Sequence, residues 1–80
     1  MAILRVKRQH VPPLRAGHPW VFAQAVADVE GAPGPGDVVE VRDTRGAFIG
    51  RGFYSPGTSI PVRVIATSER EKLDDDLIRR

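Results

Sequence analysis

The residue types best suited to act on another molecule are the basic side chains near the N-terminus. The first 27 residues hold four of the 12 lysines and arginines and none of the 10 acids: Arg5, Lys7, Arg8 and Arg15. Cations gathered without carboxylates suit a polyanion, and phosphate contacts supply most of the affinity of proteins for nucleic acids. These four residues are therefore candidate phosphate contacts. A solvated strand face is the alternative interpretation.

Four further side chains are candidate contacts to RNA: His18, Arg51, Tyr54 and Arg63. His18 can stack on a base or contact phosphate, or it can cap the preceding turn. Tyr54, beside a turn, can stack on RNA or hydrogen-bond to the backbone.

Arg51 and Arg63 lie between apolar residues on their strands, and arginine is almost never buried without a partner. They therefore face solvent or a binding partner, or they pair with Asp43 or Glu40. A domain this small has few aromatic residues to spare for its surface. Trp20 and Phe22 are accordingly predicted to be core residues.

No residue of this sequence is assigned a catalytic or metal-binding role. There is no cysteine, and the two histidines are far from any carboxylate cluster. The glycines of the Gly31–Gly36 loop lack the lysine and the following helix that a phosphate-binding P-loop requires. The acidic run Asp74–Asp76 is expected at the start of a helix, where carboxylates favour the helix dipole, and not in a paired-carboxylate site.

The elements that position these residues are short strands separated by turns. Period-two alternation and turn signals predict strands over residues 2–7, 25–30, 37–42, 47–54 and 60–65. A turn over 43–46 joins two of them as a hairpin. Pro13 to Gly17 is expected to form one short helical turn. This pattern predicts a mainly β fold, a small barrel with a short helix after the first strand.

The alternation also predicts which residues face the core. Leu4 with Val6, and Val39 with Val41, are expected on buried faces, and Val26 and Val29 are expected to point inward. In the strand over 47–54, Phe48, Gly50, Gly52 and Tyr54 share one face, and Ile49, Arg51 and Phe53 share the other. Glycines two residues apart on a strand indicate a sharp bend or a close backbone approach.

Residues 1–67 are predicted to form one domain, and residues 68–80 to begin a helix or linker to a further region. Ser68 to Glu71 fits a capping box, and Leu73, Leu77 and Ile78 can form an apolar stripe. There is no apolar run of the roughly 18–20 residues that a membrane helix needs, and no signal peptide. We therefore expect a soluble, cytoplasmic protein with no membrane partner.

Three stretches together resemble a known family. They are Gly17–Phe22 (G-H-P-W-V-F), Gly36–Asp43 with Gly46, and Gly50–Pro56 (G-R-G-F-Y-S-P) continuing to Ser59–Arg63. In this order and spacing they are similar to the N-terminal PUA domain of the S-adenosylmethionine-dependent 23S rRNA cytosine-C5 methyltransferases. The resemblance spans residues 2–66, and the combination of the first and third stretches is its most specific part.

The resemblance implies a small PUA-like pseudobarrel of about five to six strands. Such domains bind structured RNA on a surface made by a short helix and adjoining strands. It also implies ribosomal RNA of the 23S type as partner, and a downstream methyltransferase domain of the same protein that holds S-adenosylmethionine. Within these 80 residues no cofactor is expected, and the enzymatic activity of the family is carried onto none of them.

Two further hypotheses stay open. An SH3-like or KOW-like barrel that mediates protein–protein or interdomain contacts would show an uncovered apolar patch without flanking arginine. Alternatively, the domain orients its own methyltransferase domain and touches RNA only weakly. The RNA-binding hypothesis instead predicts one contiguous positive face, formed by the N-terminal strand, the helix and the strands that carry Arg51 and Arg63.

Overall fold

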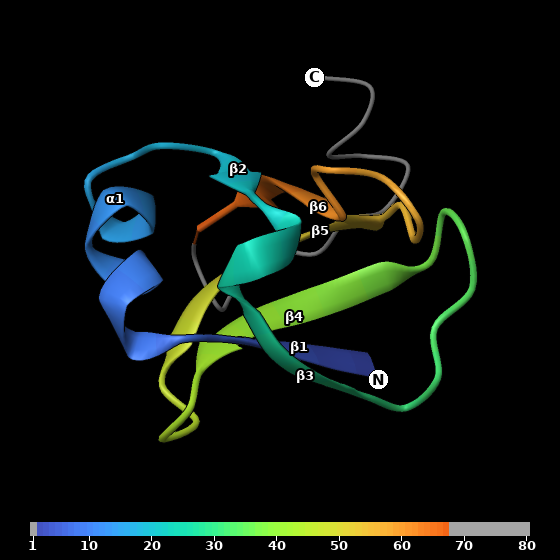
Figure 1. Ribbon diagram of the computed structural model, residues 1–80, viewed down its shortest axis with the longest axis horizontal. Coiled ribbons are helices and arrows are strands. Elements are labelled where there is room, and N and C mark those ends of the chain that lie inside the picture. Colours follow the sequence, from blue (N-terminus) through green and yellow to red (C-terminus); the bar gives the residue numbers. More distant parts are fainter. Residues whose placement is uncertain (1, 68–80) are drawn as a thin grey trace.

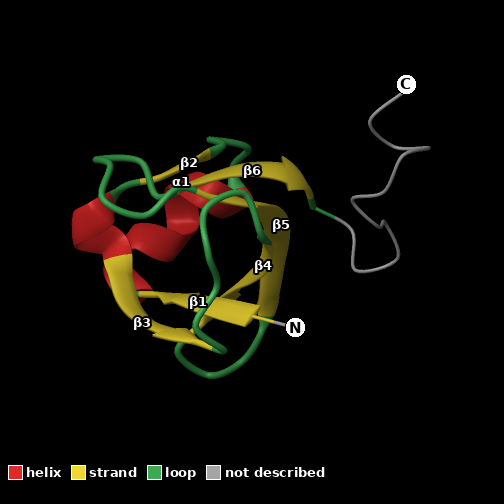
Figure 2. Ribbon diagram, turned by 90° about the vertical axis from the view of Figure 1, so that its right-hand side faces the viewer, coloured by secondary structure: helices red, strands yellow, loops and turns green. Residues whose placement is uncertain are grey.

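A computed structural model describes residues 2–67 of the chain, and its main feature is one curled sheet of six strands (Figures 1 and 2). The strands are β1 (Ala2–Val6), β2 (Trp20–Val21), β3 (Val26–Glu30), β4 (Val38–Asp43), β5 (Phe48–Tyr54) and β6 (Val62–Ala66). Their order in the sheet is β2-β6-β5-β4-β1-β3. Strands β1 and β4 pair in parallel, and the other neighbouring strands pair antiparallel. The predicted mainly β half-barrel is confirmed. The helix predicted after Ser68 lies outside the described residues.

Helical residues follow the first strand, as predicted, but they begin earlier than Pro13. The 3-10 helix η1 (Arg8–His10) runs into α1 (Val11–Arg15), which has proline in its first turn, where no backbone N–H is needed. Gly17 ends the helix with φ +105°, and its N–H donates to the Leu14 carbonyl at 3.1 Å. A second 3-10 helix, η2 (Ala23–Ala25), separates β2 from β3. None of the helices in residues 2–67 is long and apolar enough to cross a lipid bilayer.

The core fills the inside of the curled sheet and is closed by the helical segments. Its buried cluster is made of Leu4, Val6, Leu14, Val21, Ala25, Val39, Val41, Ile49 and Val62. The predicted inward positions on β1 and β4 are confirmed, and Val26 packs partly against the cluster. Val29 lies opposite the buried Leu4 and shares its face, as predicted, but it is 36% exposed. It lies on β3, an edge strand with β1 as its neighbour in the sheet.

A bulge in β5 reverses the predicted faces of Phe48 and Ile49. The rest of the strand follows the prediction, with Gly50 and Gly52 opposite the buried Val41 and Val39. Val41 is opposite Gly50 and Arg42 is opposite Phe48, which leaves Ile49 as an extra residue in β5. Ile49 therefore turns into the core. The Phe48 ring instead lies on the opposite face of the sheet, called the outer face below, beneath the guanidinium groups of Arg42 and Arg51 at 5.5 and 5.0 Å from the ring centre.

The two glycines of β5 lie where β6 approaches most closely. A Cβ at Gly50 would be 2.6 Å from Val64 Cγ1 and 2.8 Å from the Ala66 carbonyl oxygen. A Cβ at Gly52 would collide with the Arg63 carbonyl oxygen and lie 2.8 Å from Val62 Cγ1. The predicted close backbone approach is confirmed at both glycines.

The β4–β5 hairpin is closed by the side chain of Asp43. Its Oδ1 accepts the backbone N–H groups of Arg45 at 2.9 Å and Ala47 at 2.8 Å, and Gly46 follows with φ +92°. The Ala47 N–H is the main cause that lowers the pKa of the Asp43 carboxyl below its ordinary 3.8, and the charge of Arg15 contributes. The turn predicted over 43–46 is confirmed.

We expect Gly52→Ala to lower the free energy of unfolding by about 3 kcal/mol, because the new methyl group would overlap the backbone of β6. Gly34→Ala is the matched control, since a Cβ there would make only an ordinary contact of 3.6 Å with Asp37. Urea denaturation measures both variants. Equal stability of the two would show that β5 and β6 do not approach as described.

Asp43→Ala should destabilise the chain at pH 7 but not at low pH. The folded-state pKa of Asp43 is depressed, so its contribution is fully present above the unfolded value of 3.8 and is lost as the pH falls through the folded pKa. Urea denaturation between pH 7 and pH 2 measures the difference from wild type. Thr44→Ala, a change on the same exposed turn, should show no such pH dependence. A difference for Asp43→Ala that is constant with pH would contradict the assignment to the carboxylate charge.

Candidate functional site

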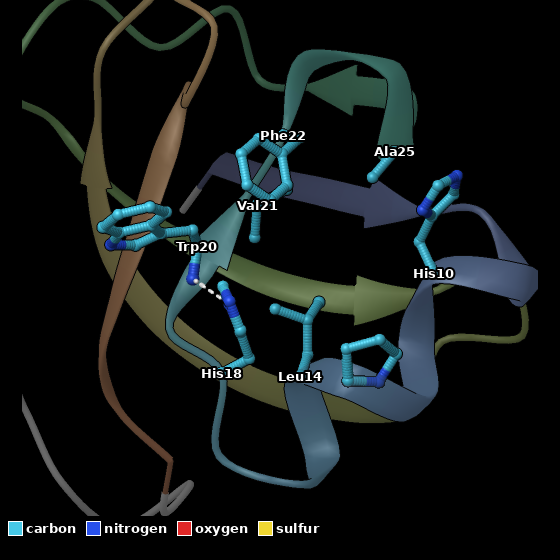
Figure 3. A pocket seen from close by; sticks show the side chains of 8 residues that line it. His10, Leu14, His18, Trp20, Val21, Phe22 and Ala25 are labelled. Atoms are coloured by element: carbon cyan, nitrogen blue, oxygen red, sulfur yellow. Dashed lines mark hydrogen bonds between the residues drawn. The ribbon is translucent and has the colours of Figure 1, made fainter.

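An apolar hollow lies between α1, β2 and η2 (Figure 3). It is a pocket of about 280 Å³. Leu14, Val21 and Ala25 form a buried apolar floor. His10, Pro13, His18, Trp20 and Phe22 complete its wall. The pocket thus collects both histidines of the chain and its single tryptophan.

Three rings of this wall, called the ring cluster below, contact one another. Trp20 lies edge-on to His18 and to Phe22, with ring centres 5.8 and 6.1 Å apart, and His18 and Phe22 are 6.3 Å apart and tilted. The Trp20 backbone N–H also points at His18 Nδ1, at 3.5 Å. Edge-to-face contacts of this kind stabilise aromatic groups mutually. None of the three pairs is stacked face to face.

The prediction that Trp20 and Phe22 are core residues is wrong. Trp20 is 41% exposed and Phe22 is 37% exposed, whereas Val21 between them is 1% exposed. On β2 alternate residues face opposite sides, so one valine enters the core and the two rings stay at the surface. The alternation around Val21 carried this signal, whereas the small number of aromatic residues in the chain favoured burial. His10, which the sequence analysis did not single out, also lines the pocket.

Exposed cations lie around the helical segments next to the pocket. Lys7 ends the extended N-terminal segment, Arg8 is in η1 and Arg15 ends α1. Within residues 2–67, none of these three side chains forms a salt bridge. Arg8 also lines a second hollow of about 240 Å³ with Arg45 and Asp43. We call the part of the molecule that carries these groups, residues 7–18, the helical end.

Arg5 is engaged on the outer face of the sheet. Its guanidinium group donates to Asp28 Oδ1 at 3.1 Å and to Glu30 Oε1 at 3.0 Å, both on the neighbouring strand β3. The hydrogen bonds to these two carboxylates, that of Asp28 first, raise the pKa of Arg5 above its usual value. Two acids therefore already balance the charge of this predicted phosphate contact.

Arg51 is also held on the outer face. Its Nη2 lies 3.4 Å from Glu40 Oε2, and Arg42 pairs with the other oxygen of the same carboxylate at 2.7 Å. Arg51 therefore forms the salt bridge to Glu40 that the sequence analysis gave as one alternative to RNA contact. Tyr54 is partly buried against the core, and its backbone hydrogen-bonds to Gly36 and Asp37.

Arg63 and His18 lie elsewhere. Arg63 is exposed on β6 directly opposite Trp20 of β2, so the two side chains share a face. His18 is exposed in the ring cluster.

The structure therefore divides the predicted site residues into two groups. Arg5 and Arg51 point away from the core on the outer face, whereas α1 packs on the core side through Leu14. Lys7, Arg8, Arg15 and His18 belong to the helical end. Arg63 points away from the core on β6, between Trp20 of β2 and Phe53 of β5. The single contiguous positive face expected from the sequence is not formed by the whole set. Of the predicted site residues, His18 lines the pocket, and Arg8 and Arg15 belong to the helical segments that contribute His10, Pro13 and Leu14 to it.

Comparison with known proteins gives a consistent result. A family model described as a PUA-like domain matches residues 4–67. Among curated proteins, the chain is similar to the ribosomal RNA large subunit methyltransferase I of Pseudoalteromonas translucida (37% identity over 67 residues) and of Alteromonas mediterranea (43% over 67 residues). Each match covers 84% of this chain and 17% of the relative. For the protein of that name from Erwinia tasmaniensis, the identity is 40% over 63 residues, which cover 79% of this chain and 16% of the relative.

Trp20→Ala should lower the free energy of unfolding by only about 1 kcal/mol, because the ring is at the surface. Leu14→Ala, from the floor of the same pocket, should cost about 2–4 kcal/mol because it opens a cavity in the core. Chemical denaturation followed by circular dichroism measures both without depending on tryptophan emission. Equal costs for the two substitutions would place Trp20 in the core after all.

Proposed function

The chain belongs to the PUA-like domain family, and from this premise we propose that it is an RNA-binding module that docks a methyltransferase on ribosomal RNA. The chain spans about 17% of the length of the curated relatives that it matches. In this proposal the chemistry belongs to the remainder of a longer protein. That remainder would hold S-adenosylmethionine and methylate cytosine C5 in 23S-type RNA, as the resemblance implies.

The observation that carries the proposal is the grouping of exposed cations beside the aromatic pocket. Lys7, Arg8 and Arg15 form no salt bridge with a carboxylate of the described residues, although the charge of Arg15 interacts with that of Asp43 in the β4–β5 turn. Arg63 lies across from the exposed ring of Trp20. Phosphate contacts position an RNA chain, and aromatic or histidine faces hold its unstacked bases. The helical end carries these cations and also contributes His10 and His18 to the aromatic pocket.

The outer face contributes less to RNA binding in this proposal. For Arg5 to bind a phosphate, it would first have to leave Asp28 and Glu30, and the phosphate would approach two carboxylates. Arg51 shares the Glu40 carboxylate with Arg42 and lies over Phe48. We infer that these two arginines mainly fix the strands β1, β3, β4 and β5 relative to one another.

The protein-docking alternative finds less support. The outer side of β6 has a shallow hollow lined by Phe53, Ile60 and Ile65, but Arg63 lies in the same hollow. The alternative predicted an apolar patch without flanking arginine. Contacts of this surface with the remainder of a longer protein are compatible with RNA binding at the helical end.

We expect Arg15→Gln to weaken the binding of ribosomal RNA fragments several-fold and to lower the slope of log K against log salt by about 1. Arg5→Gln removes the same charge from the outer face and should change neither quantity appreciably. Fluorescence anisotropy of labelled RNA with the 80-residue chain, over a salt series, measures both variants.

Duplex DNA serves as the competitor in the same titrations. Selective RNA binding that is weakened by Arg15→Gln would support the module and its location. Equal losses for the two variants would move the contact surface toward the outer face. Absence of RNA binding at low salt would contradict the proposal and favour a role in arranging a catalytic domain or a protein partner.

A further inference from the structure

The pocket at the helical end has a different chemistry from the cations beside it. Its floor is apolar and buried, and its exposed wall consists of rings. At about 280 Å³ it is at the small end of the roughly 300–1,000 Å³ that ligand pockets occupy. A space of this size suits one planar ring system. It does not suit a phosphate, which needs donors and gains nothing from an apolar floor.

We propose that this pocket takes one unpaired base of the bound RNA, held against the ring cluster of His18, Trp20 and Phe22. The inference rests on the proposed RNA-binding function and assigns a second kind of contact within it. The phosphate contacts would position the RNA chain, and the pocket would select a site where a base can leave its helix. Bases in loops, bulges and ends can do so without loss of pairing.

The geometry of the rings supports a stacked base. Because the three rings meet edge-on or tilted, they do not use one another as stacking partners. Trp20 and Phe22 retain a large exposed fraction although each is a large apolar group. Stacking of a base on such a ring is worth about 1–3 kcal/mol and tolerates any base, since every base has a π face.

The polar groups of the pocket match the edge of a base. His10 and Trp20 lie at opposite ends of the pocket, and His18 lies between Trp20 and Leu14 (Figure 3). A neutral imidazole has one donor and one acceptor nitrogen, so His10 can meet either kind of group on a base edge.

Charge next to the pocket favours nucleic acid over an apolar protein side chain as the occupant. Arg15 directly follows Leu14 of the pocket floor in the sequence, and Arg63 lies opposite Trp20. A base in the pocket would therefore bring its flanking phosphates near segments of the chain that carry cations. A leucine or phenylalanine side chain from a protein partner would gain nothing from these two arginines.

The single tryptophan makes the inference directly measurable. The 80-residue chain is titrated with an RNA hairpin that carries a one-nucleotide bulge, and with the same hairpin in which the bulged nucleotide is abasic. Anisotropy reports binding, and Trp20 emission reports stacking. We expect the bulged RNA to quench Trp20 and to bind about 5- to 100-fold more tightly than the abasic RNA. Both RNAs should show the same salt slope, because they present the same phosphates.

Phe22→Ala tests the protein side of the pocket and keeps the reporter. It should reduce the affinity for the bulged RNA toward that for the abasic RNA and leave the latter unchanged. Phe48→Ala removes an equal ring beneath Arg42 and Arg51 on the outer face and should preserve the preference for the bulge. Circular dichroism checks that both variants fold. The comparison of the two RNAs on the unaltered chain needs no variant.

The outcomes separate the inference from the function on which it rests. Equal binding of the bulged and abasic RNAs, with unchanged Trp20 emission, would overturn the pocket inference and leave RNA binding intact. Absence of binding to either RNA would overturn both. A response of Trp20 to a phenylalanine-containing peptide but not to RNA would overturn the pocket inference and assign the pocket to a protein partner.

Discussion

The close passage of β6 over β5 is the constraint on which the rest of the molecule depends. At Gly50 and Gly52 the backbone and side chains of β6 occupy the space that a side chain would need. Among the described strands, β2 has β6 as its neighbour, and the Val64 N–H donates to the Pro19 carbonyl at 2.6 Å just before β2. The two glycines therefore allow β6 to lie close to β5. The position of β6 in turn sets the position of β2 and of the ring of Trp20.

The arrangement of charge follows from the same sheet. Acids and arginines alternate across the outer faces of β3, β1, β4 and β5, so that Asp28, Glu30 and Glu40 are each matched by an arginine. These pairs are partly or largely exposed, and pairs of that kind contribute little to stability individually. Their main effect is on the electric field, because they neutralise one side of a chain with a net charge of only +2. Lys7, Arg8 and Arg15 at the helical end form no such pairs among the described residues.

Local pattern predicted much of this fold, and long-range geometry accounts for what it missed. Leu4, Val6, Val39 and Val41 were placed correctly because period two is a property of a single strand. Ile49 and Phe48 were assigned to the wrong faces because a bulge depends on the register with a partner strand. The acids that bind Arg5 lie 23 and 25 residues away in sequence, so no local signal indicates that its charge is balanced. Trp20 shows that residue type alone does not predict burial. Tryptophan is usually buried in a small domain, but here the neighbouring Val21 faces the core, and Trp20 therefore faces outward.

The parallel pairing of β1 with β4 has a consequence for how the chain acquires its structure. β1 lies between β3 and β4, whose residues come more than 20 and more than 30 positions later. The β4–β5 hairpin closes through a short turn and can form alone. In contrast, β1 can pair only after both β3 and β4 are present. Pairings between distant segments carry a larger entropic cost and slow folding. During synthesis β1 would leave the ribosome before both of its partner strands and would thus be among the last strands of this sheet to pair. The helical end, which follows β1, would become ordered only with the completed sheet.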